Sequence, residues 1–263
     1  MNKIVIVNDK IKTLKINNKI KIDLIEKQSL FGINKINIDT LDNTDLFIDI
    51  ESLELSKINF NISVNHNINI FIYSHGLESK IKYNYKITSK AHCDVVKYNN
   101  TQNVKEMVDI VLNQKHASIN YNMKSIGIKH ESYAYVIHHN CKNTISNIKN
   151  NCVNKEGNMS IQISGYVPKD IVGCVCNQSN RIINLTNKKC EIRPNLFIDC
   201  DDVSANHSAL IGKFSDEEMF YLNSRGINEI DATNLLIKGF LLSGIENKSL
   251  NSIITKDIDK YWR

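Results

Sequence analysis

A strict alternation of apolar and polar side chains is the feature that most constrains this fold. It runs from Ile58 to Val64 and resumes from Ile68 to Ile72. The same pattern returns in later runs, whose apolar positions are Ile81, Tyr83, Tyr85 and Ile87, then Ile119, Tyr121 and Met123, then Tyr133, Tyr135 and Ile137, then Met159, Ile161 and Ile163. A repeat of two residues is that of a β-strand, because successive side chains point to opposite faces. Nearly everything up to about residue 200 is therefore predicted to be β.

Many short-period strands without long helices between them are typical of either a β-sandwich or a β-solenoid. The turns are rich in asparagine, which tolerates the left-handed backbone conformation at tight corners and slightly favours the solenoid. Periodicity alone does not choose between the two. The segment 104–115 fits both a short helix and a strand, and its alternating Val108, Ile110 and Leu112 favour the strand.

The pattern changes after residue 214, where a helical segment is predicted. Ser215 and Glu218 form a capping box that starts a helix, and Gly226 ends it. A second helix is expected from about Asn228, with an apolar stripe formed by Ala232, Leu235, Leu236, Gly239 and Phe240. A third would bury Leu250, Ile253, Ile254 and Ile258. The predicted division is an N-terminal β-rich segment 1–55, a β-solenoid core 56–212 and a helical segment 213–263.

Composition excludes several classes of function. The 33 basic and 28 acidic side chains are scattered along the chain without a block of like charge, so a nucleic-acid partner is not expected. The apolar run Ile4–Val7 is too short for an export signal, and no run is long enough to span a membrane. Seven cysteines, an odd number, are expected to remain reduced thiols. The expectation is a cytoplasmic protein without a membrane partner.

Three ordered blocks carry a resemblance to a known family. They read RPNLFIDCDD at residues 193–202, NHSALIG at 206–212 and FYLNSRGI at 220–227. Together they resemble the C-terminal core of SufD proteins, in the SufB/SufD family of the SUF iron–sulfur cluster assembly system. The resemblance implies a mainly β fold, a right-handed parallel β-helix followed by a small C-terminal helical segment.

The same resemblance implies a scaffold subunit of an iron–sulfur cluster assembly complex. Such a chain pairs with a SufB-like subunit or with itself, and docks a SufC-like ABC ATPase. It is not an enzyme, because ATP hydrolysis would belong to the partner. Iron or a transient iron–sulfur cluster is the implied cargo, with no organic cofactor.

His207 aligns with the family's histidine, which the resemblance implies to be an iron or cluster ligand. A neutral imidazole is a good iron ligand and releases its proton near neutral pH. Cys200, seven residues upstream, is a second candidate metal ligand, since a thiolate binds iron well. The alternative for Cys200 is a small apolar residue that fills a strand interior.

The chain resembles the D-type subunit more than the B-type. B-type proteins place a cysteine after a glutamine, and here Gln178 is followed by Ser179. B-type proteins also follow the histidine with a glutamate, where this chain has Ser208. The position two residues before the histidine, often cysteine in D-type proteins, is Ala205.

The resemblance further implies that the helical segment faces the ATPase. The candidate contact residues are Phe220, Tyr221, Arg225 and Gly226. The alternative is that Phe220 and Tyr221 pack back onto the β-helix.

Other polar residues receive structural interpretations. Cys174 and Cys176 are expected to pack in the core, and His138 and His139 to be solvated or capping residues. Two functional alternatives to the scaffold stay open: a stand-alone structural or binding solenoid, and a carbohydrate-active solenoid enzyme. The latter requires paired carboxylates in a groove, and no such pair is visible in the sequence.

Overall fold

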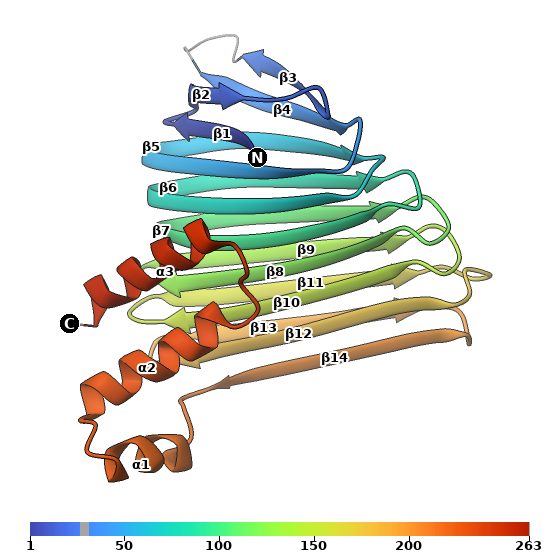
Figure 1. Ribbon diagram of the computed structural model, residues 1–263. Helices are drawn as coiled ribbons and strands as arrows, with labels where there is room; N and C mark the ends of the chain where they lie inside the picture. Colours follow the sequence, from blue (N-terminus) through green and yellow to red (C-terminus); the bar gives the residue numbers. More distant parts are fainter. Residues whose placement is uncertain (27–31, 263) are drawn as a thin grey trace.

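The computed structural model describes residues 1–26 and 32–262. It is a β-solenoid of about 7 turns, followed by three helices that lie along one side (Figure 1). The first strands are β1 Asn2–Val7, β2 Lys10–Lys15, β3 Ile20–Glu26, β4 Ile33–Thr40, β5 Thr44–Val64, β6 Ile68–Ile87 and β7 His92–Leu112. The later strands are β8 Ser118–Gly127, β9 His130–His139, β10 Ile145–Asn154, β11 Asn158–Val167, β12 Cys174–Asn184, β13 Cys190–Ile198 and β14 Val203–Gly212.

The solenoid has two faces of parallel, in-register strands. One face continues from β7 through β8, β10 and β12 to β14, and the other from β7 through β9 and β11 to β13. The strand prediction for residues 104–112 is confirmed, because β7 extends without interruption to Leu112. Along each strand the apolar half of the alternation points inward, so Ile70, Val95 and Tyr121 stack in neighbouring turns of one buried core.

A sharp corner separates the two faces within the long strands β5 and β6. Here the register shifts between Ser52 and Leu55. The backbone of Gly76 has φ +117, and a Cβ at this position would lie 2.3 Å from the carbonyl oxygen of Ser52. Only glycine fits such a conformation and such a close approach of two backbones.

The described residues 1–26 and 32–55 belong to the same solenoid. β1 pairs with β5 in parallel, with Ile4 opposite Ile48, and β4 pairs with the second half of β5, with Ile36 opposite Phe60. The boundary placed at 55/56 therefore falls inside β5. β2 and β3 pair antiparallel with β1 and β4 at the N-terminal end of the stack.

An amide ladder runs along the outer surface of the first face. Its rungs lie opposite one another in successive turns, and five hydrogen bonds of 2.8 to 3.2 Å join side chains along it. The rungs in order are Asp45, Asn69, Asp94, Asn120, Asn147, Asn177 and Asn206. The asparagine-rich composition therefore stabilises the stacking of turns as well as the corners.

The three helices are α1 Asp216–Ser224, α2 Glu229–Leu242 and α3 Lys248–Tyr261. The predicted capping box is confirmed, since Ser215 accepts from the backbone of Glu218 and Glu218 accepts from that of Ser215. The second helix begins after Asn228 as expected. No helix in the described ranges is long and apolar enough to cross a membrane.

The predicted buried face of α2 is wrong. Ala232 is buried, but so are Ile237 and Leu241, whereas Leu235 and Gly239 are exposed. The helix is apolar around most of its circumference, so the sequence did not single out one stripe. In the structure α2 packs against β10 and α3, and that contact selects its face. The stripe of α3 is confirmed at Leu250, Ile254 and Ile258, whereas Ile253 is only half-buried, and all four belong to a second apolar cluster on the outside of the solenoid.

Candidate functional site

The last turn of the solenoid forms an open end. Within the described chain, β14 pairs only with β12 and β13 pairs only with β11, so each leaves one backbone edge without a neighbouring strand. These two strands lie at the end of the stack opposite β2 and β3 (Figure 1). The opposite end of the stack is closed by β2 and β3, which pair antiparallel with β1 and β4, whereas this end presents two parallel strands of the solenoid itself. Another chain can add strands here.

His207 lies in the middle of β14 on a row that is buried in every earlier turn. Its register partner is Gln178, which is buried, and the same row continues through Ile148 and Tyr121. No further turn follows β14, so the imidazole is exposed although it stands at a core position. The residues two before and two after it on this face are Ala205 and Ala209. His207 is therefore the largest side chain at the centre of the strand.

Cys200 lies away from His207. It is half-buried in the connection between β13 and β14, so it does not fill a strand interior. The stretch from Val203 to His207 alone is about 13 Å at the ~3.3 Å rise of a strand residue. Within the described ranges, no group of three or more His, Cys, Asp or Glu side chains is arranged to hold a metal ion. The structure therefore separates the two candidate ligands within one chain.

Apolar side chains surround the open end. Leu210 and Ile211 on β14 are 54% and 41% exposed, and Phe197 on β13 is 50% exposed. Phe197 stacks on Tyr166, which stacks on His138, with ring centroids 4.8 and 5.0 Å apart. This aromatic column runs along the outer surface of the second face and ends at the last turn.

The interpretation of His139 as solvated is wrong. Its neighbour His138 points outward, so alternation turns His139 into the core, where it is fully buried. Its ring nitrogens are hydrogen-bonded to the hydroxyls of Thr144 and Ser146, both at 2.8 Å. Burial lowers the pKa of His139 to about 4, because the charged imidazolium would lose its hydration. His139 is thus a neutral core residue.

Cys174 and Cys176 are buried, as expected for core residues. Burial raises the pKa of the Cys176 thiol, which makes it a poor nucleophile and a poor metal ligand. All seven cysteines are free thiols.

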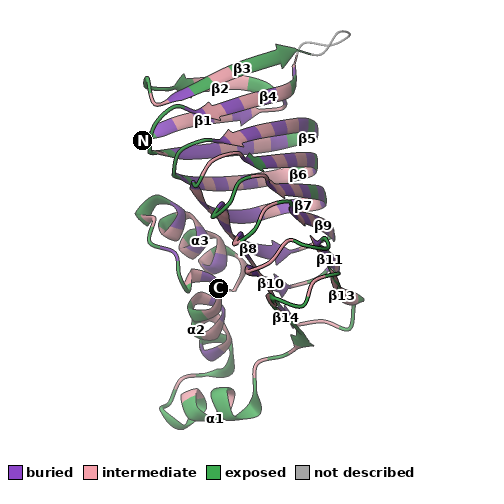
Figure 2. Cartoon of the chain, turned by 90° about the vertical axis from the view of Figure 1, so that its right-hand side faces the viewer, coloured by how far each residue is buried: buried purple, intermediate pink, exposed green. Residues whose placement is uncertain are grey.

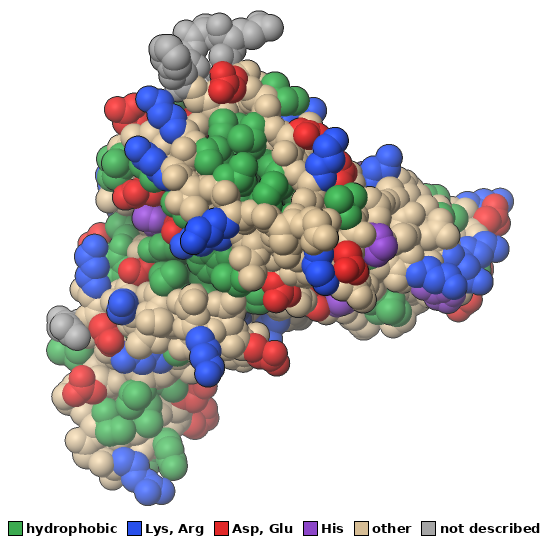
Figure 3. Space-filling view, turned by 45° about the horizontal axis from the view of Figure 1, so that its top comes forward, with side chains coloured by type: hydrophobic (Ala, Val, Ile, Leu, Met, Phe, Trp, Pro, Cys, Tyr) green, Lys and Arg blue, Asp and Glu red, His purple; other side chains and the backbone are tan. Residues whose placement is uncertain are grey.

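The helical segment presents a second exposed surface. Phe220 and Tyr221 are 74% and 59% exposed, and α1 has no buried residue. Figure 2 shows α1 projecting from the body with a largely exposed surface, and Figure 3 shows hydrophobic side chains gathered on this projection. The guanidinium of Arg225 lies 5.2 Å from the centre of the Tyr221 ring, and Gly226 takes φ +81. Phe220 and Tyr221 therefore do not pack back onto the solenoid.

A charged cluster inside the solenoid was missed by the sequence reasoning. Lys97 and Glu106 form a fully buried ion pair, and burial lowers the pKa of Lys97 and raises that of Glu106. Glu131 is also fully buried, accepts hydrogen bonds from Asn99 and Ser125, and has its pKa raised by burial to about 7. The signal was present in the alternation, which assigns all three charged residues to inward positions.

A family model matches most of this chain, and several known proteins match parts of it. A family model described as "SUF system FeS cluster assembly, SufBD core domain" matches residues 58–240. An iron–sulfur cluster assembly SufBD family protein of Mycobacterium leprae is 48% identical over 63 residues, which are 23% of this chain and 16% of that protein. The iron–sulfur cluster assembly protein SufD of Escherichia coli is 45% identical over 58 residues, 21% of this chain and 14% of that protein. SufD of Bacillus subtilis is 36% identical over 90 residues, 31% of this chain and 20% of that protein. The aligned segments thus span a fifth or less of these relatives.

Proposed function

Because the chain belongs to the SufBD core family of the SUF iron–sulfur cluster assembly system, we propose that it is a non-catalytic scaffold subunit of such an assembly complex. The observation that carries the proposal is His207, an exposed imidazole at a core position on the open end of the solenoid. A scaffold of this kind needs a ligand that a partner chain can reach, and the exposure of the His207 imidazole supports that role.

The partner at the open end is a second scaffold chain, either a SufB-like subunit or another copy of this one. The free edge of β14 can pair with a strand, and exposed Leu210 and Ile211 supply apolar area to bury. β14 spans residues 203–212, so its midpoint lies between His207 and Ser208. Antiparallel pairing of two such strands about that midpoint brings the two histidines close together. The same pairing carries each Cys200 to the outer ends of the interface.

The cargo is iron or a nascent iron–sulfur cluster, held only while the complex assembles it. His207 offers one neutral nitrogen ligand. The remaining ligands come from the partner chain, because the described part of this chain holds no group of three or more His, Cys, Asp or Glu side chains that could bind a metal ion. This division suits a D-type subunit, which completes a site that it does not build alone.

The helical segment docks an ABC-type ATPase in this proposal. The exposed rings of Phe220 and Tyr221 and the exposed side chain of Ile230 supply apolar area for such a contact. Arg225 stands beside Tyr221 and offers a charged contact to an acidic group of the partner. We place the complex in the cytoplasm, where seven free thiols remain reduced.

A glycosidase-like activity has less support. The pKa of Glu131 is raised into the range of a general acid, but the side chain is fully buried and cannot contact a substrate. Its neighbours belong to the interior of the solenoid.

The test is anaerobic co-expression of the chain with a SufB-like subunit and a SufC-like ATPase, followed by pull-down and analysis of bound iron and sulfide. His207→Ala is expected to retain both partners but lose most of the iron and sulfide. His116→Ala, an exposed turn histidine, is the matched control and is expected to behave as wild type. If neither partner is retained by the wild-type chain, the scaffold proposal is wrong.

Two further variants separate the surfaces. Leu210→Asp is expected to release the second scaffold chain while the ATPase stays bound. Phe220→Asp is expected to have the opposite effect, and α1 buries no residue, so the fold is expected to survive. Loss of both partners in either variant would contradict the assignment of two separate docking surfaces.

A further inference from the structure

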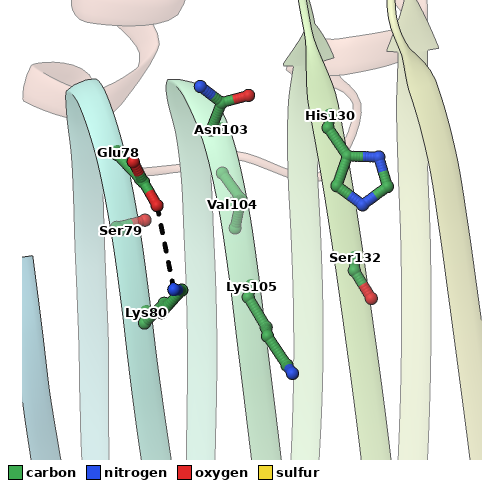
Figure 4. A pocket seen from close by; sticks show the side chains of 8 residues that line it. All are labelled: Glu78, Ser79, Lys80, Asn103, Val104, Lys105, His130 and Ser132. Carbon is green, nitrogen blue, oxygen red and sulfur yellow. Dashed lines mark ion pairs between the residues drawn. The ribbon is translucent and has the colours of Figure 1, made fainter. Parts of the chain in front are cut away.

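A polar pocket lies on the outer surface of the second face, away from the open end and from the helices. Its cavity volume is about 430 Å³, and it is lined by residues of three neighbouring strands, β6, β7 and β9. Figure 4 shows these side chains just past the corner, with Glu78 and Lys80 on β6, Asn103 and Lys105 on β7, and His130 on β9. The corner creates the hollow, because the strands change direction immediately before these residues.

Three lysines form a row in this region. Lys57 lies opposite Lys80, and Lys80 lies opposite Lys105, in parallel register. Neighbouring strands are about 4.8 Å apart, so the Cα atoms of the three lysines lie within about 10 Å of one another. All three side chains are on the exposed face of their strands. Like charges directly opposite one another in a sheet repel, so this row is an electrostatic cost in the free protein.

Local carboxylates compensate this charge only in part. Lys80 lies 3.9 Å from Glu78, which is the outer limit of an ion pair. In the described part of the chain, no carboxylate lies within 4.0 Å of the ammonium of Lys57 or Lys105. By contrast, Lys82, two residues further along β6, forms an ion pair with Asp109 at 2.6 Å. The row that borders the pocket therefore keeps positive charge that its own carboxylates offset only at Lys80.

The other lining groups define the chemistry of a ligand. The pocket wall holds two lysines against one carboxylate, that of Glu78, which lies 3.9 Å from the ammonium of Lys80. Ser132, His130 and Asn103 add hydrogen-bonding side chains. The lining contains no Phe, Tyr or Trp, and its one apolar side chain, Val104, is itself buried. A nucleotide base would find no ring to stack on. A compact, multiply charged anion matches the wall.

We propose that this pocket binds a short oligophosphate, with Lys80 and Lys105 as its main charged contacts and Lys57 extending the row. A linear chain of phosphoryl groups spreads its negative charge along a short distance, as the lysine row spreads its positive charge. His130 and Ser132 donate hydrogen bonds to phosphoryl oxygens at the β9 side. This site is separate from the proposed scaffold function, and its test needs no partner protein.

The test is isothermal titration calorimetry of the purified chain with tripolyphosphate at low salt, with citrate as a carboxylate anion of similar charge. The variant Lys80→Ala/Lys105→Ala removes the two lysines that line the pocket. The matched control Lys90→Ala/Lys142→Ala removes two exposed lysines in turns elsewhere and changes the net charge equally. Circular dichroism checks that each variant keeps its fold.

Tripolyphosphate is expected to bind the wild type and the control with similar affinity. Each pocket lysine removed is expected to weaken binding roughly fivefold, the effect of one charge pair near 4 Å in water. Equal weakening in the control variant would overturn the proposal, because binding would then follow net charge alone. Undetectable binding to the wild type, or citrate binding as tight as that of tripolyphosphate, would overturn it as well.

Discussion

The substitution Glu131→Gln is expected to stabilise the protein at pH 8 and to have little effect at acidic pH. The carboxyl group lies inside the solenoid and is fully buried, where Asn99 donates a hydrogen bond at 3.1 Å and Ser125 one at 2.8 Å. A glutamine can replace these contacts, since its carbonyl accepts from Asn99 and its amide donates to the Ser125 hydroxyl oxygen. The variant thus resembles the protonated acid at every pH.

The magnitude follows from the raised pKa of Glu131. Burial raises this pKa from 4.5 to about 7 in the folded chain. The stability associated with the protonated acid is fully present below pH 4.5 and is lost as the pH rises through 7. A shift of about 2.5 pKa units at 1.36 kcal/mol each corresponds to about 3 kcal/mol, most of which is lost between pH 5 and pH 8.

The assay is urea unfolding of the isolated wild type and variant at pH 5 and pH 8. Subtracting the free energy of unfolding of the wild type from that of the variant at each pH cancels the contributions of the other groups that titrate. The free energy of unfolding of Glu131→Gln minus that of the wild type is expected to be about 2 to 3 kcal/mol larger at pH 8 than at pH 5. Glu54→Gln, at an exposed position, controls for the change in net charge. Parallel pH dependences for wild type and Glu131→Gln would refute the reasoning, because Glu131 would then be as easily ionised in the folded chain as in the unfolded one.

Three further outcomes are expected in urea unfolding. Burial lowers the pKa of His139 to about 4 in the folded chain, so the stability that the neutral imidazole contributes is fully present above pH 6.5. That stability falls by about 3 kcal/mol as the pH drops to 4, and His139→Gln should remove this pH dependence of the free energy of unfolding. Gly76→Ala should destabilise the folded chain by on the order of 3 kcal/mol or more, because its Cβ would collide with the carbonyl of Ser52. Gly239→Ala has open space around it and should stabilise α2 by about 0.5 to 1 kcal/mol. Asn147→Ala interrupts the amide ladder at two hydrogen bonds and should cost about 1 to 2 kcal/mol; an unchanged midpoint would show that the ladder adds nothing to the stacking.

Much of the candidate site could be predicted from short-range pattern. The block around His207 carried the family resemblance, and the predicted solenoid core 56–212 includes that residue. Its exposure could not be predicted, because His207 occupies the same inward row as buried Gln178 and differs only in having no turn after it. The distance from Cys200 to His207 likewise depends on where the strand begins. Neither property is visible in the spacing of residue types.

The sequence by itself determined the features that depend on neighbours two to four residues apart. These are the strands, whose side chains alternate, the start of α1 at Ser215, and the face of α3 that holds Leu250, Ile254 and Ile258. Inward positions for Lys97, Glu106 and Glu131 were also contained in the alternation, although no local rule explains why charges should occupy them.

The tertiary structure alone decided which turns stack and what the stacking brings together. Register partners lie about 24 to 30 residues apart along the chain, as Asn61 and Asn37 or Asn177 and Asn147 do. The same stacking set the row of Lys57, Lys80 and Lys105 and left β14 with a free edge. The buried face of α2 was decided in the same way, by contact with β10 and α3. The physical reason is that alternation fixes only which face of its strand a side chain occupies, whereas its neighbours on that face come from other turns and are set by packing of the whole solenoid.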